Sequence, residues 1–517
     1  MPHHTRPIRF FHRGQIQAVD GLAPTTTVLG YLREHAQPHC SGSKEGCAEG
    51  DCGACTVLLG ELDASGQLQL RNVNACTQFL PTLDGQALWT VEDLGSAEAL
   101  NPVQQALVDC HASQCGFCTP GFAMSLQASY ERHCQSGSRP DRQELADALA
   151  GNLCRCTGYR PLLDAGQRMF ELPQQTLDLA PARAALHSLQ QDPPLHYAAA
   201  QPAIPGRVDQ FHAPRSLAEL AALREAKPQA RLLAGSTDIG LWVNKRFRDL
   251  GDVIYLGAVA ELKAIRPEPF DGQPGLWIGA GASLEAAWSA LSAAVPPLRE
   301  LWLRFASPPV RQAGTLGGNI ANGSPIGDGA PALIALGAHI VLRRGSQQRR
   351  LALEDFYLGY MQNAMQPGEF VEGMHLPLPL PGPAQRIRAY KIAKRYDSDI
   401  SAVCAALSLR LDEAGRVQEA RLAFGGMAAI VRRSAPAEQA LLGQSWSDEA
   451  ALQAAQAALA LDFQPLSDMR ASADYRLQVA QNLLRRFWLE TRPDAPLPAA
   501  SLSVWQAVRF SDVEQAR

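Results

Sequence analysis

Four cysteines near the start of the chain have a spacing that suits an inorganic cluster. Cys47, Cys52 and Cys55 stand at C-x4-C-x2-C in the segment KEGCAEGDCGACTVLLG, and Cys76 follows further along the chain. Two irons need four thiolates that converge on one small object, so three of them must come from a tightly wrapped loop. The fourth would return from the far side of a hairpin. This is the plant-type [2Fe–2S] spacing, and it predicts such a cluster.

The loop that carries these cysteines is rich in glycine. We expect Gly46, Gly50 and Gly53 to take left-handed backbone conformations, which would bring N–H groups close to the sulfur atoms. The alternatives are a structural zinc site and unligated thiols. Zinc loops favour C-x2-4-C pairs, so three cysteines among closely spaced glycines suit zinc poorly.

Two further pairs of cysteines form a second candidate centre. These are Cys115 and Cys118 in SQCGFCTPGF, and Cys154 and Cys156 in GNLCRCTGYRP. Each pair stands just before an expected helix start, at Pro120 and Pro161. Helix N-termini stabilise anionic sulfur through their dipole and their N–H groups, so the two loops could close on one metal centre. The spacing alone leaves zinc open as well as iron.

The other cysteines receive no role. Eleven of the twelve cysteines lie before residue 157, and no export signal precedes them, so metal binding is favoured over a disulfide framework. Cys40, Cys110, Cys134 and Cys404 fit no ligand pattern and are expected to be unligated, partly or fully buried thiols.

Two loops in the middle of the chain suit a phosphate-bearing ligand. RLLAGSTDIGLWV reads as an apolar strand, a tight turn that needs Gly235, and a helix-like run, and its N–H groups and hydroxyls could cradle a pyrophosphate. RQAGTLGGNIANGSPIGDGAP is a loop of small polar residues that permits a charged ligand to approach closely. Two ordinary surface turns are the alternative. A dinucleotide fingerprint is not favoured, because IGAGASLEAAW lacks the third small residue.

Short strands and helices must position the first cysteines. Two hairpins are expected, over residues 8–11 and 16–19 and over residues 56–59 and 67–70. A short helix from Thr27 to about Glu34, capped by Thr25 or Thr26, lies between them. The pattern predicts a small α+β domain over residues 1–92.

The second cysteine set lies in a helical segment. Residues 93–170 predict four short helices that start at Pro102, Pro120, Asp141 and Pro161, with Asp141 and Glu144 forming a capping box. Residues 171–205 are rich in proline, glutamine and alanine. The prolines should break any regular element there, so this segment is expected to be a linker.

The remainder of the chain alternates strand-like and helix-like runs. Strand runs at 232–233, 253–256 and 276–278 alternate with helical runs at 216–226 and 284–294. They predict an α/β or α+β domain over residues 206–383. Strands within 390–411 and 417–424, followed by alanine-rich helices near 448–460 and 471–490, predict a further domain over residues 384–500.

Composition excludes several classes of protein. The chain has 517 residues, of which 46% are hydrophobic and 19% charged, with a net charge of -4. These values indicate several globular domains and exclude wholesale disorder. No basic run indicates a nucleic-acid-binding surface, and no apolar stretch is long enough to span a membrane. The N-terminal segment lacks the apolar core of a signal peptide, so a cytoplasmic location is expected.

The three cysteine segments carry a resemblance to a known family. GCAEGDCGACTV, QCGFCTPGF and NLCRCTGYRP, in this order, resemble the iron–sulfur portion of the xanthine oxidase family of molybdenum hydroxylases. The resemblance implies a β-grasp, plant-type ferredoxin domain followed by a four-helix domain with a second [2Fe–2S] cluster. It also implies that all eight paired cysteines are cluster ligands.

The two polar loops resemble the FAD-binding domain of the same family, which has the vanillyl-alcohol-oxidase-like α+β fold. The resemblance implies a pyrophosphate loop at Leu232, Leu233, Ala234, Gly235, Ser236, Thr237, Asp238 and Ile239, and a second phosphate loop at Thr315, Leu316, Gly317, Gly318 and Asn319. It further implies cofactor contacts at Phe305, Asp328, Val371 and Lys391. RLAFGGMAAIVRRS resembles the start of the C-terminal flavoprotein domain. No histidine or cysteine is placed to tether the flavin, so the FAD is expected to be noncovalent.

A chain that combines two clusters and FAD, with the molybdenum site elsewhere, resembles the small subunit of bacterial xanthine dehydrogenases. This implies electron transfer from a molybdopterin-binding large subunit, through two [2Fe–2S] clusters, to FAD and then NAD. The expected assembly is a heterotetramer with two copies of each chain and no nucleic-acid or membrane partner. One alternative is the same role in a two-chain molybdenum hydroxylase that acts on another N-heterocycle or an aldehyde. A non-enzyme alternative is a zinc-stabilised scaffold or a stand-alone electron carrier.

Overall fold

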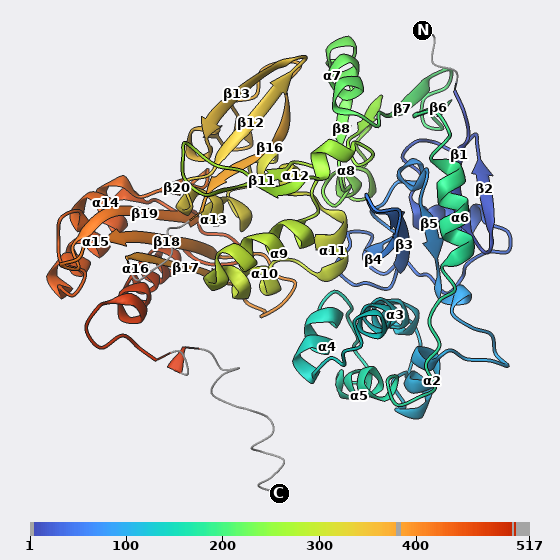
Figure 1. Ribbon diagram of the computed structural model, residues 1–517, viewed down its shortest axis with the longest axis horizontal. Helices are drawn as coiled ribbons and strands as arrows, with labels where there is room; N and C mark the ends of the chain where they lie inside the picture. Colours follow the sequence, from blue (N-terminus) through green and yellow to red (C-terminus); the bar gives the residue numbers. More distant parts are fainter. Residues whose placement is uncertain (1–4, 379–383, 499–500, 503–517) are drawn as a thin grey trace, which may run out of the picture.

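The computed structural model describes residues 5–378, 384–498 and 501–502 (Figure 1). The N-terminal unit is a mixed sheet with the strand order β2-β1-β5-β3-β4. Its strands are β1 Ile8–His12, β2 Gln15–Val19, β3 Thr56–Leu62, β4 Leu68–Asn74 and β5 Ala87–Trp89. β1 runs parallel to β5 and the other neighbours are antiparallel, which confirms both predicted hairpins.

The predicted helix between the hairpins is present, but its cap differs from the expected one. α1 Val28–Gly30 continues into a π-helical turn over Tyr31–His35. The cap is Thr27, whose Oγ1 accepts a hydrogen bond from the Gly30 N–H at 3.0 Å. The prediction of Thr25 or Thr26 is wrong because Thr26 belongs to the preceding turn, where its N–H donates to the Ala23 carbonyl.

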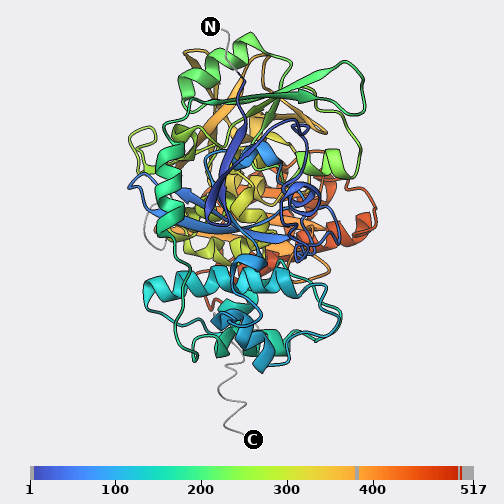
Figure 2. The ribbon, with the colours of Figure 1, turned by 90° about the vertical axis from the view of Figure 1, so that its right-hand side faces the viewer.

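The four predicted helices follow. They are α2 Pro102–Asp109, α3 Thr119–Ser136, α4 Arg142–Leu149 and α5 Arg160–Arg168. The Asp141 carboxylate accepts a hydrogen bond from the Glu144 N–H at 2.8 Å, and the Glu144 carboxylate accepts one from the Asp141 N–H at 2.9 Å. This confirms the capping box. Both ribbon views place these helices at one end of the molecule, beside the first sheet (Figures 1 and 2).

The prediction that prolines exclude regular structure from residues 171–205 is wrong. The segment contains α6 Ala180–Leu189 and β6 Leu195–Ala200. Pro181 lies in the first turn of α6, where the missing N–H has no helical partner to lose. Leu186 and Leu189 are buried in one hydrophobic cluster with Leu58 of β3, so tertiary packing stabilises a helix whose sequence pattern is weak.

Two further sheets are built from the end of this segment and the residues after it. The first has the order β6-β7-β9-β8 and contains β7 Val208–Ala213, β8 Arg231–Leu233 and β9 Val253–Tyr255, with helices α7 Leu217–Ala226 and α8 Ile239–Asn244. The second is antiparallel and contains β10 Ile265–Pro267, β11 Gly275–Gly279, β16 Phe370–Pro377, β12 His339–Arg344 and β13 Gln347–Ala352, in that spatial order.

The connection between β11 and β12 is helical. It contains α9 Leu284–Ala294, α10 Arg299–Arg304, α11 Pro308–Ala313, α12 Leu316–Ala321 and α13 Gly329–Ala335. A small hairpin of β14 Tyr357–Gly359 and β15 Gln362–Asn363 precedes β16. The predicted strands and helices of this region are therefore present.

The last unit is a four-stranded sheet covered by helices. Its strands are β17 Gln385–Ile392, β18 Val403–Leu411, β19 Val417–Gly425 and β20 Arg432–Arg433, and its helices are α14 Ala435–Leu441, α15 Glu449–Asp462 and α16 Ala473–Thr491. The predicted run over 390–411 is two strands separated by a loop at 393–402. This loop reaches back toward the N-terminal units, because the Ser398 hydroxyl donates to the Ala150 carbonyl at 3.0 Å.

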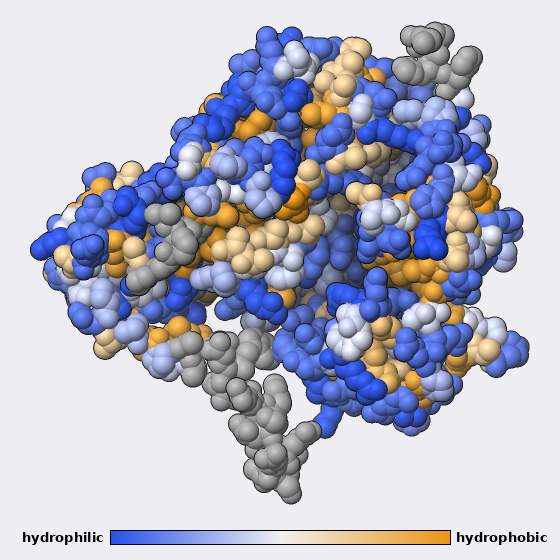
Figure 3. Space-filling model, viewed as in Figure 1, coloured by the Kyte–Doolittle hydropathy of each residue, from blue (hydrophilic) through white to orange (hydrophobic). Residues whose placement is uncertain are grey.

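The first sheet is packed on both faces. Leu58 lies in a cluster with the helical unit, whereas its neighbours Val57 and Leu59 lie in a cluster with β6, β7, β8 and β9. Successive side chains of a strand point to opposite faces, so the apolar run of β3 joins two units at once. The face in Figure 3 is mainly hydrophilic and is hollowed at its centre.

The limits predicted for the domains stay predictions. The expected boundary between the third and fourth units adjoins residues 379–383, and the expected end of the fourth unit falls at 499–500; both stretches lie outside the described residues. Within the described part of the chain, none of the helices combines the length and the apolar character needed to cross a membrane.

Truncating the buried face of α6 should weaken the contact between this helix and the first sheet. We expect Leu186→Ala to lower the free energy of unfolding of the N-terminal units by about 2–5 kcal/mol, because it leaves a cavity in a packed cluster. The first transition in chemical unfolding, followed by far-ultraviolet circular dichroism, measures this loss. Arg183→Ala on the exposed side of α6 is the control, and an equal effect of both changes would contradict the packing role.

Candidate functional site

The structure brings the first four cysteines together at one end of the first sheet. Cys47, Cys52 and Cys55 lie in the loop before β3, and Cys76 lies just beyond β4, across the hairpin. Hydrogen bonds from the thiols of Cys52 and Cys76 lower the pKa of Cys47. Cys76 also contacts Cys55, and both of these cysteines are buried. Four thiols from two segments therefore converge, as the spacing predicts.

Two of the three predicted left-handed glycines are confirmed. Gly50 and Gly53 have φ of +83° and +68°, and the loop also contains Ala48 at +55°. The prediction for Gly46 is wrong, because this residue is needed for space and not for backbone angle. A Cβ at Gly46 would lie 2.9 Å from the Cys52 sulfur and 3.3 Å from the Phe117 ring. The Cys52 N–H donates to the Cys47 sulfur at 3.3 Å.

An orphaned amide fits a cluster at this position. Asn74, at the end of β4, is 2% exposed, and among the described residues neither its Nδ2 nor its Oδ1 has a hydrogen-bond partner. The Cys76 hydrogen bond is the main cause of the lowered pKa of Cys55, and the Asn74 side chain contributes to it. Buried amide donors normally find partners, so an inorganic sulfide or thiolate beside Cys55 would satisfy the Asn74 Nδ2 donor.

The second set of cysteines also converges. Cys115 contacts Cys156, and Cys118 contacts Cys154. Cys118 is the residue before the first turn of α3, and Cys154 and Cys156 precede α5, so the predicted position at two helix starts is confirmed. In contrast to the first set, Cys115 and Cys156 are exposed.

The surroundings of Cys154 favour a thiolate. Burial raises its pKa, but hydrogen bonds from the Thr157 hydroxyl at 3.3 Å, the Cys156 N–H at 3.4 Å and the Thr157 N–H at 3.5 Å outweigh burial and lower the pKa to about 7. The thiolate is the form that binds metal. Over residues 5–378, 384–498 and 501–502, no three or more cysteine, histidine or acidic side chains are placed so that together they could hold one metal ion.

The first predicted phosphate loop offers unused donors. Among the described residues, no acceptor takes the N–H groups of Ser236, Thr237 and Asp238, and the buried Ser236 hydroxyl also lacks a partner. Gly235 does not have a positive φ; Ser236 does, at +62°. The left-handed residue of the predicted turn is therefore Ser236 and not Gly235. A Cβ there would lie 1.9 Å from the Ala313 carbonyl oxygen, so Gly235 lets two loops touch.

The second predicted phosphate loop uses its N–H groups internally. The N–H groups of Leu316 and Gly317 donate to the carbonyls of Ala282 and Ala280 at 3.0 and 2.9 Å. Those of Gly318 and Asn319 donate to the Thr315 hydroxyl and carbonyl at 3.1 and 3.0 Å. The buried Asn319 Oδ1 has no partner in the described part of the chain, so this oxygen is one atom that the loop can offer to a ligand.

A buried ion pair joins the flavin segments. Lys391 Nζ donates to Asp328 Oδ2 at 2.5 Å and to the Ser401 hydroxyl at 3.0 Å, and Ser401 donates to Asp328 Oδ1 at 2.5 Å. Lys391 and Asp328 are 4% and 6% exposed. Sequence reasoning missed Ser401, because its role depends on contact with Asp328, which is distant in the sequence.

A cavity of about 340 Å³ connects the cysteine loop with the flavin segments. The predicted residues Phe305, Asn319, Asp328 and Lys391 line it. The cavity is also lined by Glu49, Gly50 and Asp51, from the loop between Cys47 and Cys52. Ser307 lines it as well, and its hydroxyl has no hydrogen-bond partner among the described residues. The structure thus brings the first cysteine set and the predicted flavin contacts to one cavity.

Other predicted contacts lie elsewhere. Leu233 and Leu316 are fully buried core residues, and Val371 lies in β16 within the largest hydrophobic cluster. Residues 234–239 and 315–318 do not line this cavity, although the two loops touch: Asn322 Nδ2 donates to Asp238 Oδ2 at 2.8 Å. The roles of these residues in binding FAD stay predictions.

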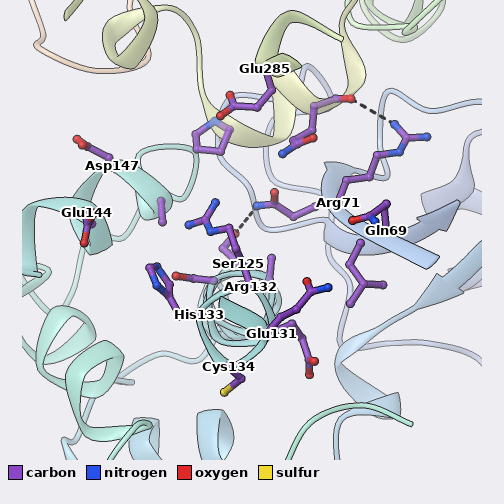
Figure 4. Close-up of a pocket in the computed structure, with 18 of the residues that line it drawn as sticks. Gln69, Arg71, Ser125, Glu131, Arg132, His133, Cys134, Glu144, Asp147 and Glu285 are labelled. Atoms are coloured by element: carbon purple, nitrogen blue, oxygen red, sulfur yellow. Dashed lines mark hydrogen bonds between the residues drawn. The ribbon is translucent and has the colours of Figure 1, made fainter. Parts of the chain in front are cut away.

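A larger cavity of about 710 Å³ lies where α3, α4, β4 and the helices after β11 meet (Figure 4). Charged side chains such as Arg71, Arg132, Glu131 and Asp147 line it, and Arg71 spans two units by donating to the Gln312 carbonyl at 3.3 Å. No predicted site residue lines it, so we assign no ligand to this cavity.

Three family models match the chain. One, described as an FAD binding domain in molybdopterin dehydrogenase, matches residues 207–379. One, described as a CO dehydrogenase flavoprotein C-terminal domain, matches residues 388–491. One, described as a [2Fe-2S] binding domain, matches residues 90–167.

Known structures and sequences agree with these matches. A solved CO dehydrogenase from Oligotropha carboxidovorans is 30% identical, with a TM-score of 0.50, over 55% of this chain and 96% of that chain. This chain belongs to the xanthine oxidase family of molybdenum hydroxylases. Xanthine dehydrogenase of Emericella nidulans is 30% identical over 93% of this chain, which spans only 38% of that relative's length. Quinoline 2-oxidoreductase of Pseudomonas putida 86 is 25% identical, with a TM-score of 0.50, over 56% of this chain and 98% of that chain.

Membership of the molybdenum hydroxylase family confirms the predicted α+β fold and the [2Fe–2S]- and FAD-binding domains. The ligand positions, and the number of clusters, stay predictions.

Adding a methyl group at Gly235 should disturb the flavin loops. We expect Gly235→Ala to lower FAD content strongly, because the new Cβ would overlap the Ala313 carbonyl and separate the two loops. Both iron–sulfur signals should persist. FAD released on denaturation measures the loss. Gly359→Ala is the control, since its nearest neighbour is a flexible glutamine at 3.4 Å. Full FAD occupancy in Gly235→Ala would remove this loop from the site.

Each cysteine set should hold its own cluster. We expect about four irons per wild-type chain, since each [2Fe–2S] cluster has two. Cys52→Ser should remove one electron paramagnetic resonance signal and Cys154→Ser the other, because the sets share no cysteine. Cys134→Ser, in α3, should leave both signals. Loss of both signals from either ligand change in a folded protein would contradict two independent sites.

Proposed function

We propose that the chain is the electron-transfer subunit of a xanthine dehydrogenase. A partner chain with molybdopterin would oxidise hypoxanthine and xanthine to urate, and this chain would pass the electrons to NAD. Similarity to xanthine dehydrogenase of Emericella nidulans over 93% of the chain supports this activity. Bound here, two [2Fe–2S] clusters would supply single-electron transfer and FAD would exchange single electrons for a hydride.

The contiguity of the three candidate sites carries the proposal. The Leu153 N–H, beside Cys154, donates to the Cys52 carbonyl at 3.0 Å, so the two cysteine loops touch. The loop between Cys47 and Cys52 in turn lines the cavity that contains Phe305 and Lys391. Protein groups on this chain would thus hold the three redox groups in one continuous series.

The chain's own residues would position each group. Eight thiolates would hold the clusters, and Asn74 would donate to sulfur beside Cys55. The N–H groups of residues 236–238 would receive the pyrophosphate. The Lys391–Asp328 pair would place a donor at the cavity wall, where Ser401 fixes its direction.

Electrons would enter at the exposed cysteine pair. Phe117, between Cys115 and Cys118, is 45% exposed, and Val108 of α2 is 57% exposed. A groove of about 500 Å³ adjoins them and is lined by apolar residues such as Leu107 and Pro120. Exposed apolar surface of this kind suits a protein partner, which we propose to be the molybdopterin-binding large subunit in an assembly of two copies each.

A different substrate is the second candidate. The same electron-transfer role could serve a molybdenum hydroxylase that acts on another N-heterocycle or an aldehyde. The similarity to quinoline 2-oxidoreductase of Pseudomonas putida 86 favours this alternative, at 25% identity. The two candidates differ in the substrate that the partner oxidises, and they share the residues described above.

The purified chain should carry out the reaction with NADH but not the oxidation of xanthine. We expect it to reduce an artificial dye with NADH, because the proposed flavin and cluster residues all lie on this chain. It should not oxidise xanthine without the partner, and mixing with a molybdopterin-containing large subunit should restore xanthine-dependent NAD reduction. Absorbance changes of the dye, NADH and urate measure these steps. Xanthine turnover by the isolated chain would refute the subunit role, and failure of NADH to reduce a chain replete with FAD would refute NAD as acceptor.

A further inference from the structure

A buried amide bridges the two cysteine loops. Asn152, two residues before Cys154, is 2% exposed. Its Nδ2 donates to the Gly53 carbonyl at 3.1 Å and to the Thr56 hydroxyl at 3.3 Å. Gly53 lies between Cys52 and Cys55, so one side chain of the second loop is bonded to the backbone of the first.

The other end of this amide is also fixed. Asn152 Oδ1 accepts a hydrogen bond from the Ser125 hydroxyl of α3 at 2.6 Å. Ser125 in turn accepts one from Asn72 of β4 at 3.3 Å (Figure 4). The network therefore ties α3 and the first sheet to the point where the two cysteine loops meet, and every polar group of the Asn152 side chain is used.

The backbones around Asn152 are in direct contact. A Cβ at Gly53 would lie 2.2 Å from the Gly151 carbonyl oxygen and 2.5 Å from Asn152 Nδ2. A Cβ at Gly121 would lie 2.1 Å from the Gly53 carbonyl oxygen. Next to Asn152, the Leu153 N–H donates a hydrogen bond to the Cys52 carbonyl. A single peptide hydrogen bond thus joins one ligand-bearing loop to the residue before Cys154.

We propose that Asn152 is a positioning residue for electron transfer between the two cysteine-bound centres. Its hydrogen bond to Gly53 fixes the position of Leu153 relative to the first cysteine loop, so the Leu153–Cys52 hydrogen bond is maintained. The two centres then keep a fixed, short separation. The inference rests on the proposed function, because it takes both cysteine sets as cluster ligands.

The two cysteine segments also meet on the exposed side. Gly46 faces the Phe117 ring, and Lys44 lies over the same ring at 5.9 Å. A ring that is 45% exposed limits how closely the loops approach but sets no direction. Hydrogen bonds are directional, so the Asn152 network and the Leu153–Cys52 bond beside it are the contacts that orient one loop on the other.

The test compares magnetic coupling in the full chain with both clusters reduced. A reduced cluster speeds the spin relaxation of a nearby one, and this effect falls as the separation grows. Asn152→Leu keeps the volume but removes the donors and the acceptor. We expect it to keep the wild-type content of iron and labile sulfide and to lose the relaxation enhancement between the two signals. The microwave power that saturates each signal measures that loss.

A matched pair of serines keeps the test decisive even where Asn152→Leu binds less iron. Ser125 and Ser129 lie one turn apart in α3, and both are buried. Ser125 belongs to the network, whereas the Ser129 hydroxyl has no partner within the described residues. Ser125→Ala should weaken the coupling in the same direction as Asn152→Leu, and Ser129→Ala should leave it at the wild-type level.

The outcomes distinguish this inference from the proposed function. Wild-type coupling in an iron-replete Asn152→Leu chain, or equal effects of the two serine changes, would overturn the inference alone. A wild-type chain that binds zinc in place of iron would overturn the proposed function, and the inference with it. Loss of coupling at full iron content in Asn152→Leu and Ser125→Ala supports the positioning role.

Discussion

Backbone-to-backbone contact, at places where no side chain fits, is the constraint on which the arrangement of this chain depends. A Cβ at Gly121 would overlap the carbonyl of Gly53, one at Gly235 would overlap that of Ala313, and one at Gly240 would come within 2.7 Å of that of Thr77. Each contact joins two segments that carry candidate cofactor residues. Electron transfer slows steeply with separation, so close contacts of this kind suit the proposed series of redox groups.

The first sheet makes these contacts possible because both of its faces are buried. β3 places Leu58 against the helical unit and Val57 against the β6–β9 sheet, so one strand sets the distance between three units. The cysteine loop that precedes this strand therefore lies where the three units come together. Asn244 of α8 donates to the carbonyls of Cys76 and Ala48 at 2.7 and 3.0 Å, and this links the flavin side to the first cysteine set.

The sites differ in their exposure in a way that suits their proposed order. The first cysteine set and the Lys391–Asp328 pair are largely buried, whereas Cys115 and Cys156 lie at the surface. A buried ion pair is weak support for stability by itself, since desolvation offsets most of the attraction. The Lys391–Asp328 pair is better explained by the cavity that it lines, where it would give a bound ligand a fixed charge and a fixed donor.

The sequence by itself determined the features that depend on near neighbours. Cysteine spacing selected both candidate ligand sets, the prolines and the Asp141 capping box located the helix starts, and short strand-like runs on either side of a turn located the hairpins, because these signals act within a few residues. Only the tertiary structure decided where distant segments touch. It formed α6 despite its prolines, made Gly46 and Gly235 necessary for space and not for backbone angle, and gave Asn152 and Ser401 their partners. Each of these outcomes depends on atoms from segments far apart in the chain, which no local pattern of residues specifies.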